Sequence, residues 1–259
     1  MRSWSVSSPN SRACGAIMEP EPFGRRGLGD EFEGTSETYE HIQRGAAAAI
    51  WRFMQLRYYD RCAGMRVLDI GNGGWSPSEV LGERVAASLQ YFVGLDKSLP
   101  MLQRKGGEFA RVAGDGLQLP FNDGSFDYVL VNGVLHHLGY KSREENCRRV
   151  QELIAEAVRV CSRGLIVYEL FVNSFLETLE RMAARLVRFV PTFVLSEKTL
   201  DAYLDELGVQ RGETASRTLA ALTGPFHWHV VIMNYGWFKL PACLSPFRHG
   251  FFVIRKKQP

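Results

Sequence analysis

The feature that most constrains the fold is a short apolar run that ends in glycines. Residues 67–70 read Val-Leu-Asp-Ile, a strand pattern around one acid, and Gly71, Gly73 and Gly74 follow. Glycine has no Cβ, so the chain can turn sharply here and approach another group closely. From Pro77 to Gln90 the apolar residues recur at helical spacing. The order strand, glycine turn, helix is typical of the opening unit of a doubly wound α/β domain.

Two classes of nucleotide-binding protein compete for this pattern. A dinucleotide fingerprint needs G-x-G-x-x-G, and Gly71 and Gly73 fit it, but the third position is Ser76. Asp69 stands two residues before the first glycine. The resulting pattern, acid-x-Gly-x-Gly, resembles motif I of the class I S-adenosylmethionine-dependent methyltransferases. In that family the glycine turn packs against the methionine part of the cofactor, and the acid helps to orient its ammonium group. The resemblance therefore implies cofactor-binding residues at Asp69, Gly71, Asn72 and Gly73.

Two later stretches resemble further motifs of the family in order and spacing. Residues 91–96 read as a second strand that ends in Asp96, with Lys97 next. By resemblance Asp96 holds the two ribose hydroxyls, since a carboxylate can accept from both. A Gly-Asp-Gly turn follows at Asp115 and Gly116. In the family, the acid of this turn reaches the adenine amino group, so the cofactor site is expected to include all four residues.

The central strand carries the fourth resemblance. Residues 123–132 read as a turn and then a strand, and Asn132 and Gly133 stand at its end. Ligands bind at the carboxyl edge of open α/β sheets, so this backbone is expected to line the methionine side of the cofactor site. Over about residues 65–170 the match is closest to the subgroup of ubiquinone and menaquinone biosynthesis methyltransferases.

The expected fold is α/β: a Rossmann-like, seven-stranded, mostly parallel sheet with helices on both faces. A helical N-terminal cover and a C-terminal insertion complete it. We expect a disordered tail over residues 1–34 and a single methyltransferase domain over 35–259. Its cofactor core spans 65–170, and its substrate-side additions span 35–62 and 172–248.

The two additions have open roles. The helix expected within residues 36–61 either folds over the cofactor, as in related methyltransferases, or only covers the sheet. Phe175–Phe189 and Thr199–Leu207 are expected helices. The aromatic residues from Phe226 to Phe247 are either plain core or the wall of a pocket for a planar or lipidic substrate. The second interpretation is favoured because a minimal domain does not need them.

Methyl transfer from a sulfonium mainly requires alignment of nucleophile, methyl and sulfur, and in some reactions removal of a proton. His136 follows the central strand, and an imidazole that titrates near neutrality can take that proton. Glu169, at the end of the fifth strand, faces the same edge. Both are candidate catalytic residues, ahead of His137; the alternative for His136 is a loop anchor. The pair His227-x-His229 lacks a suitably spaced carboxylate, so no metal site is expected.

Composition and motifs disfavour other partners. The formal net charge is only +3, with scattered basic residues, which does not indicate nucleic acid. The run Asn132-Gly133-Val134-Leu135 also lacks the prolines that base amino methyltransferases carry there. The five cysteines form no C-x-x-C pair and suit reduced thiols in a cytoplasm. No apolar run is long enough to cross a membrane, so no integral membrane association is expected.

The predicted function is methyl transfer from S-adenosylmethionine to an oxygen, nitrogen or carbon of a small molecule, with the oligomeric state left open. The alternative is a non-catalytic cofactor-binding or scaffold protein. It gains weight because Trp75 replaces the usual third glycine and Ser162-Arg163-Gly164 replaces a Pro-Gly-Gly turn. A nicotinamide-dependent oxidoreductase is disfavoured by the missing third glycine and by the Asp123–Asp127 turn.

Overall fold

The computed structural model describes most of the chain from residue 48 onward. The described residues are 48–103, 107–138, 143–172, 178, 182, 196–224, 228–233, 236–245 and 247–255. The tail expected over 1–34 and nearly all of the helix expected over Phe175–Phe189 lie outside them.

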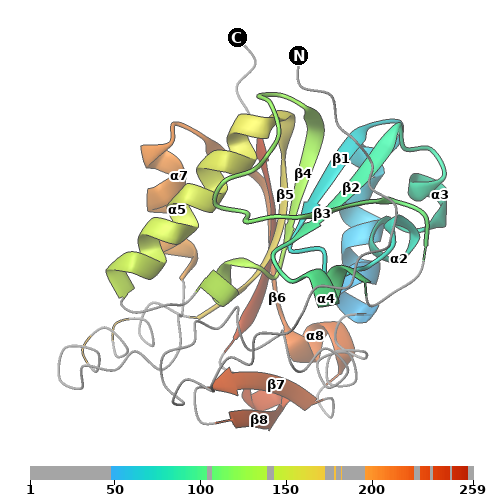
Figure 1. Ribbon diagram of the computed structural model, residues 1–259. Helices are drawn as coiled ribbons and strands as arrows, with labels where there is room; N and C mark the ends of the chain where they lie inside the picture. The colour runs from blue at the N-terminus through green and yellow to red at the C-terminus, as the bar shows by residue number, and fades with distance from the viewer. Residues whose placement is uncertain are drawn as a thin grey trace, which may run out of the picture.

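A seven-stranded sheet forms the centre of the molecule, in the order β3-β2-β1-β4-β5-β9-β6 (Figure 1). Neighbours from β3 to β5 pair in parallel, whereas β9 runs antiparallel to both β5 and β6. The predicted seven-stranded, mostly parallel α/β sheet is therefore confirmed. Its strands are β1 (Arg66–Ile70), β2 (Tyr91–Asp96), β3 (Ala110–Ala113), β4 (Phe126–Asn132), β5 (Cys161–Phe171), β6 (Gln210–Thr218) and β9 (Arg248–Arg255).

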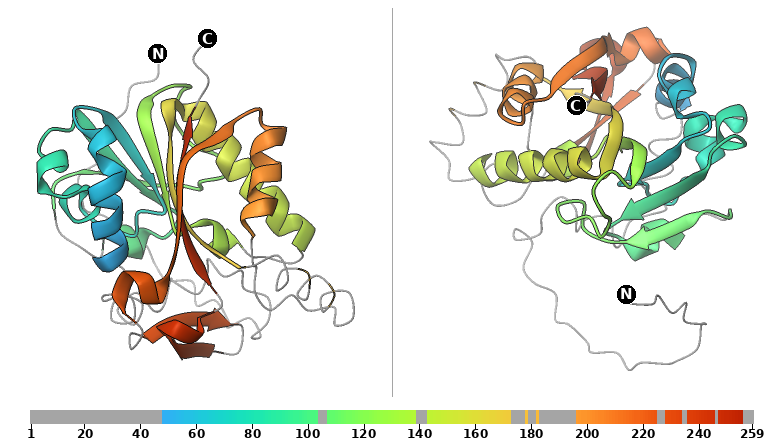
Figure 2. Two further views of the ribbon diagram at one scale, coloured as in Figure 1. Left: turned by 180° about the vertical axis from the view of Figure 1, so that it is seen from behind. Right: turned by 90° about the horizontal axis from the view of Figure 1, so that it is seen from above.

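Helices cover both faces of the sheet, as the two views of Figure 2 show. One face carries α5 (Arg143–Val160) and α7 (Glu197–Glu206); the other carries helical residues 48–57, α2 (Pro77–Leu81) and α3 (Glu83–Ala86). Shorter helices are η2 (Tyr59–Cys62), α4 (Leu99–Gln103), η3 (Leu135–Leu138), α8 (Leu219–Thr223) and η4 (Ala242–Leu244).

The strands divide their side chains between the two helical layers with a period of two. Leu68 and Ile70 of β1 pack into a first apolar cluster, which includes side chains of α5 and α7. Val67 packs into a second apolar cluster, which includes side chains of helical residues 48–57. In β4, Val129 and Val131 face the first cluster and Leu130 faces the second. Burial on both faces explains why these strands read as continuous apolar runs in the sequence.

An addition between β6 and β9 lies beyond the edge where the parallel strands end (Figure 1). It consists of α8, η4 and an antiparallel hairpin of β7 (Trp228–Met233) and β8 (Gly236–Pro241), which forms a sheet of its own. This addition falls within the stretch for which the sequence predicted a C-terminal insertion.

Two local expectations need correction. The helix expected from Pro77 to Gln90 is two short helices, because Gly82 adopts φ 84° and ψ 152° and interrupts it. The turn expected before the fifth strand is also absent, since α5 ends at Val160 and β5 begins at Cys161. Gly164 is instead a paired strand residue, where a Cβ would come under 3.0 Å from the Ile254 carbonyl oxygen. Its glycine therefore permits close pairing of β5 with β9.

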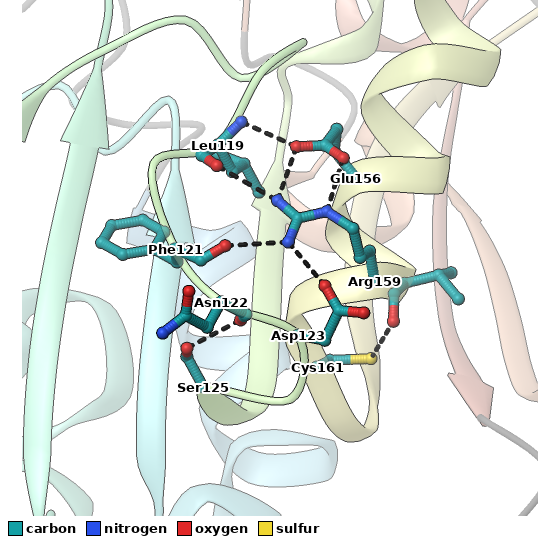
Figure 3. A network of polar contacts seen from close by, with 9 residues as sticks. Leu119, Phe121, Asn122, Asp123, Ser125, Glu156, Arg159 and Cys161 are labelled. Atoms are coloured by element: carbon teal, nitrogen blue, oxygen red, sulfur yellow. Dashed lines mark hydrogen bonds and ion pairs between the residues drawn. The ribbon is translucent and has the colours of Figure 1, made fainter.

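Arg159, near the end of α5, holds the long segment between β3 and β4 (Figure 3). Its guanidinium donates to the carbonyl oxygens of Leu119 (3.1 Å) and Phe121 (2.8 Å) and pairs with Asp123 (2.8 Å). Glu156 bonds the same guanidinium and accepts the Leu119 N–H at 2.8 Å. Its pKa is held below the usual range, chiefly by its hydrogen bonds to Arg159. These bonds fix the far half of the segment that begins with the Asp115 turn.

Candidate functional site

Four predicted site positions lie at one edge of the sheet. Asp69 is in β1, Asp96 ends β2, Asn132 ends β4 and Glu169 is near the end of β5. These four strands are parallel neighbours in the order β2-β1-β4-β5. Their carboxyl ends therefore meet at one edge, where open α/β sheets bind ligands.

The glycine turn after β1 depends on its glycines. Gly71, Gly73 and Gly74 have φ values of 69°, 59° and 82°, a region that other L-residues avoid. A Cβ on Gly71 would lie 2.5 Å from Val134 Cγ2, and one on Gly74 would lie under 3.0 Å from a carbonyl oxygen of α4. The turn is thus packed between Val134 and α4, and Gly74 supplies the additional glycine that Trp75 does not.

Backbone donors of the site orient the Asp96 carboxylate. Oδ2 accepts the Gly73 N–H at 2.9 Å, and Oδ1 accepts the Ser98 N–H at 2.9 Å. A carboxylate can accept at both oxygens, and these two bonds, one to each oxygen, fix its direction. Asp96 is half-buried and Lys97 beside it is exposed. This arrangement presents a held carboxylate next to the glycine turn.

Asp69 lies behind the turn rather than on its surface. The residue is 2% exposed, and its carboxylate accepts the side-chain amides of Asn72 at 2.8 Å and Asn132 at 3.1 Å. Burial raises the pKa of Asp69 to about 7, and the nearby charge of Asp96 adds to this, while the two amide donors oppose it. Asn72 also donates to the Trp75 carbonyl at 2.9 Å. The side chains of Asp69 and Asn72 therefore brace the turn from inside.

The Asp115 turn comes close to the end of β1. Asp115 is exposed, and its Oδ1 accepts the Leu117 N–H at 3.0 Å. A Cβ on Gly116 would lie 3.1 Å from Ile70 Cγ2 and 3.3 Å from Leu153 Cδ1. Gly116 thus fits tightly against the sheet and α5, which holds Asp115 at the same edge as the glycine turn.

His136 and Glu169, separate candidates in the sequence, form one pair. Glu169 is fully buried, and it accepts the N–H groups of Leu135 (2.6 Å) and Leu170 (2.7 Å). Its Oε1 lies 2.5 Å from His136 Nδ1. This contact assigns the imidazole proton to Nδ1 and leaves Nε2 as the acceptor. The His136 side chain is 22% exposed. Burial lowers the pKa of His137 well below its usual value, so His137 is neutral at pH 7.

Gly133 places His136 at the end of the central strand. Its N–H donates to the Tyr168 carbonyl at 2.8 Å, and its φ is 67°. A Cβ there would lie 3.4 Å from Tyr168 Cε1 and 3.7 Å from His136 Cε1. The backbone of Gly133 therefore lies close to both rings, next to the His136–Glu169 pair.

Tyr59 lies at the candidate site, although it was not among the residues predicted from the sequence. Tyr59 is fully buried, and its hydroxyl donates to Asn132 Oδ1 at 2.9 Å. The adjacent tyrosine, Tyr58, instead donates to the Phe251 carbonyl at 3.3 Å. Two successive tyrosines give no signal in the sequence of which one faces the site. Residues 48–62 thus cover the sheet, and through Tyr59 they also reach the candidate site.

Two classes of feature are absent from the part of the chain that the structure describes. No group of three or more His, Cys, Asp and Glu side chains is arranged to hold a metal ion there; His227 lies outside the described residues. Within those residues, no helix combines the length and apolar character that a bilayer crossing requires.

Comparison with known families identifies the central part of the chain. Residues 68–168 match the family described as a methyltransferase domain. Those residues run from β1 into β5 and so contain the glycine turn, Asp96, Asp115 and His136.

Curated relatives resemble the chain over different shares of their length. A demethylmenaquinone methyltransferase of Corynebacterium glutamicum strain R is 28% identical over 48% of this chain and 52% of its own. Another of that name, from Corynebacterium kroppenstedtii, is 26% identical over 74% and 84%. A mouse protein named "Probable tRNA methyltransferase 9B" is 28% identical over 58% and 31%. The chain thus spans about half the length of the first curated relatives it matches, 52%.

Solved structures share the fold at low identity. Magnesium protoporphyrin IX methyltransferase from Synechocystis PCC 6803 with bound SAH has a TM-score of 0.54 at 15% identity, covering 89% of this chain and 98% of its own. The [4+2]-cyclase SpnF has a TM-score of 0.59 at 13% identity, covering 91% and 97%. One fold thus serves two chemistries. By its matched residues and its sheet, the chain resembles the class I S-adenosylmethionine-dependent methyltransferases of the menaquinone and ubiquinone subgroup.

Proposed function

We propose that this protein is an enzyme that transfers the methyl group of S-adenosylmethionine to a small molecule. The observation that carries the proposal is the Asp96 carboxylate, held by the Gly73 and Ser98 N–H groups beside the glycine turn. A fixed carboxylate at this place suits the two vicinal hydroxyls of a ribose. The non-catalytic alternative is weaker, because Gly74 supplies a glycine next to Trp75, where a Cβ would meet the carbonyl oxygen of Met101.

The remaining predicted cofactor residues fit around Asp96. In the proposed site, the turn at Gly71 and Gly73 packs against the methionine part of the cofactor, and the backbone of Asn132 and Gly133 borders it. A Cβ at Gly71 or Gly74 would take the space of neighbouring groups, which agrees with a closely fitted turn. Asp115 and Gly116 are proposed to face the adenine, and Lys97 to lie beside the ribose. Asp69 and Asn72 are assigned to support of the turn, because their side chains bond within it.

The proposed chemistry needs alignment and one proton acceptor. When bound, S-adenosylmethionine would supply the methyl group. The lone pair of the acceptor forms the new bond to the methyl carbon, and sulfur keeps the electron pair of the broken carbon–sulfur bond. His136 Nε2 takes the proton that the acceptor loses. Glu169 holds the opposite nitrogen of the ring, which fixes the tautomer and stabilises the imidazolium that forms. Glu169 therefore acts as a positioning residue, since its carboxylate is fully buried.

The proposed acceptor is a planar small molecule, with the methylated atom undefined. Support comes from the names of similar proteins, which act on demethylmenaquinone and on magnesium protoporphyrin IX. The addition formed by α8, β7, β8 and η4 stands beyond the same sheet edge (Figure 1), where it can cover an acceptor. We propose a cytoplasmic location, in keeping with the free thiols of Cys62, Cys147, Cys161 and Cys243.

Binding of S-adenosylhomocysteine tests the cofactor assignment. Calorimetric titration of the purified protein is expected to show micromolar affinity, with no heat from NADH as the control ligand. Asp96→Ala is expected to abolish binding. Asp123→Ala, which removes the same charge from the exposed turn bonded to Arg159, is expected to bind as wild type does. Failure of the wild-type protein to bind, or normal binding by Asp96→Ala, would sink the assignment.

Methyl transfer tests the proton acceptor. The protein is incubated with methyl-labelled S-adenosylmethionine and a panel of quinols and porphyrins, with transfer RNA as a separate arm. His136→Asn is expected to lower kcat by about 10²- to 10⁴-fold, the usual range for a general base, with unchanged affinity for S-adenosylhomocysteine. Glu169→Gln is expected to lower kcat less. Normal turnover by His136→Asn contradicts its role as base, and label on transfer RNA alone contradicts the acceptor class.

A further inference from the structure

A continuous series of hydrogen bonds joins the N-terminal segment to the glycine turn. It begins at Tyr59 of η2, whose hydroxyl donates to Asn132 Oδ1 at 2.9 Å. Asn132 Nδ2 donates to one oxygen of Asp69 at 3.1 Å, and Asn72 Nδ2 donates to the other at 2.8 Å. Asn72 then bonds the Trp75 carbonyl at 2.9 Å. Five residues from η2, β4, β1 and the glycine turn are connected in this way.

Tyr59 and Asp69 together set which way the Asn132 amide faces. An asparagine side chain has an oxygen that only accepts and a nitrogen that only donates. With the Tyr59 hydroxyl donating to Oδ1, Nδ2 must point toward the Asp69 carboxylate. If the amide rotated, its oxygen would face an oxygen of ionised Asp69, and both groups would be acceptors. The Tyr59 hydroxyl and the Asp69 carboxylate therefore favour the same orientation of Asn132, and loss of the hydroxyl removes one of the two bonds that hold it.

Asp69 passes this constraint to the turn. Its two oxygens accept one amide N–H each, so loss of the Asn132 donor removes one of these two bonds and keeps the one from Asn72. The Asn72 side chain in turn holds two groups of the turn: the Trp75 carbonyl at 2.9 Å and the Gly74 N–H at 3.1 Å. Gly73, next to this clamp, donates the N–H that orients Asp96. A change at Tyr59 can thus reach the Asp96 carboxylate through bonded neighbours.

The element that carries Tyr59 is anchored independently of this series. Arg61 forms an ion pair with Glu213 of β6, and Gln55 donates to the Val80 carbonyl at 3.1 Å. Tyr58 donates to the Phe251 carbonyl of β9. These contacts hold η2 and the helical residues before it against the sheet whether or not the Tyr59 hydroxyl is present. Removal of that one oxygen is therefore a local change.

We propose that Tyr59 is a positioning residue for cofactor binding, acting through Asn132 and Asp69 on the glycine turn. This inference rests on the proposed function, because it assigns the turn to the cofactor. It gives the N-terminal segment a role in the reaction that covering the sheet does not require. Tyr59 touches neither cofactor nor acceptor in this account; it sets the geometry of the residues that do.

A pH-dependent effect distinguishes this role from simple packing. The titratable groups that face Asp69 are Asp96 of β2 and Tyr59 and Cys62 of η2. Burial raises the pKa of Tyr59 well above 10 and that of Cys62 to about 12, so both are neutral near pH 7. The Asn132 donor lowers the pKa of Asp69. Loss of its orientation is therefore expected to move the Asp69 titration, and the cofactor affinity that depends on it, to higher pH.

Tyr59→Phe is tested against Tyr58→Phe as a matched control. Both tyrosines are fully buried, are adjacent and lose one hydrogen bond in this substitution. Tyr59→Phe is expected to weaken S-adenosylhomocysteine binding about tenfold, the size of one buried hydrogen bond, and to shift the midpoint of its pH dependence upward. Tyr58→Phe is expected to match wild type in both. Circular dichroism and thermal unfolding show whether each variant is folded.

The outcomes separate the two proposals. If wild-type protein binds no S-adenosylhomocysteine, the proposed function fails. If wild type binds and Tyr59→Phe binds equally well, or if both variants lose the same affinity without a pH shift, the role of Tyr59 is refuted while the function stands. Asn132→Ala supplies a second check, because Tyr59→Phe should add nothing in that background. Additive losses would show that Tyr59 does not act through Asn132.

Discussion

Substitution of Gly74 by alanine is expected to disable the glycine turn through contact with α4. Gly74 has a φ of 82°, and a Cβ there would come under 3.0 Å from the Met101 carbonyl oxygen and within 3.2 Å of the Leu102 carbonyl oxygen. Both are backbone atoms of a helix, so neither can rotate away. The left-handed conformation costs about 1–2 kcal/mol for a non-glycine residue, and forced overpacking costs about 1–3 kcal/mol. After a gain of about 0.4–1 kcal/mol from the less flexible unfolded chain is subtracted, the free energy of unfolding should fall by about 1–5 kcal/mol.

Gly124→Ala is the matched control for this substitution. Gly124 has a φ of 65°, and a Cβ there would meet no atom within 4 Å in the described part of the chain, apart from its own sequence neighbours. Gly124→Ala shares with Gly74→Ala the cost of a left-handed backbone at a non-glycine residue and the gain of about 0.4–1 kcal/mol from a less flexible unfolded chain. The difference between the two variants thus isolates the crowding against α4, about 1–3 kcal/mol.

Urea unfolding followed by circular dichroism measures both variants, and calorimetry measures their binding of S-adenosylhomocysteine. Gly74→Ala is expected to lose binding as well as stability, because relief of the clash must move either the turn or α4. Gly124→Ala should keep wild-type affinity. Equal free energies of unfolding for the two variants would refute the steric argument, and normal binding by Gly74→Ala would refute the link between this turn and the ligand.

Two further predictions follow from buried groups. Burial raises the folded-state pKa of Asp69 to about 7, so its contribution to stability is complete below the unfolded pKa of about 4 and is lost as pH rises through 7. The free energy of unfolding of wild type relative to Asp69→Asn should therefore fall by about 3 kcal/mol between pH 5 and pH 8. Parallel plots of this free energy against pH for the two proteins would exclude such a shift. Burial raises the pKa of the Cys62 thiol to about 12, so this thiol should resist a thiol reagent at pH 8 until the protein unfolds, whereas exposed Cys243 should react at once. Mass spectrometry of the labelled peptides measures both reactions. Modification of Cys62 as early as that of Cys243 would contradict its burial.

Features that depend on short stretches could be predicted from the sequence. The apolar runs of β1 and β4 predicted buried strands because both faces of the sheet are covered. The glycines at 71 and 73 predicted a special backbone turn, and their φ values are positive. The helix at Pro77 was only half predicted, because helical periodicity continues through Gly82 while the backbone breaks there.

The burial of the two acids near strand ends could not be predicted from the sequence. Asp69 and Asp96 look alike in sequence, each near the end of a strand and next to a turn. The structure places Asp96 half-buried at the edge and Asp69 buried behind the turn with two amides. No local pattern distinguishes them, because burial depends on the elements packed around each strand. Their roles toward a cofactor stay predictions for the binding experiments.

The sequence by itself determined the order of strands and turns, the fold class and the positions of candidate acids, since periodicity and glycine act over a few residues. Tertiary structure alone decided which of these groups touch. His136 meets Glu169 across 33 residues, and Tyr59 meets Asn132 across 73. Such contacts arise because parallel strands bring their carboxyl ends to one edge, and hydrogen bonds there depend on ångström-scale packing of all the elements together.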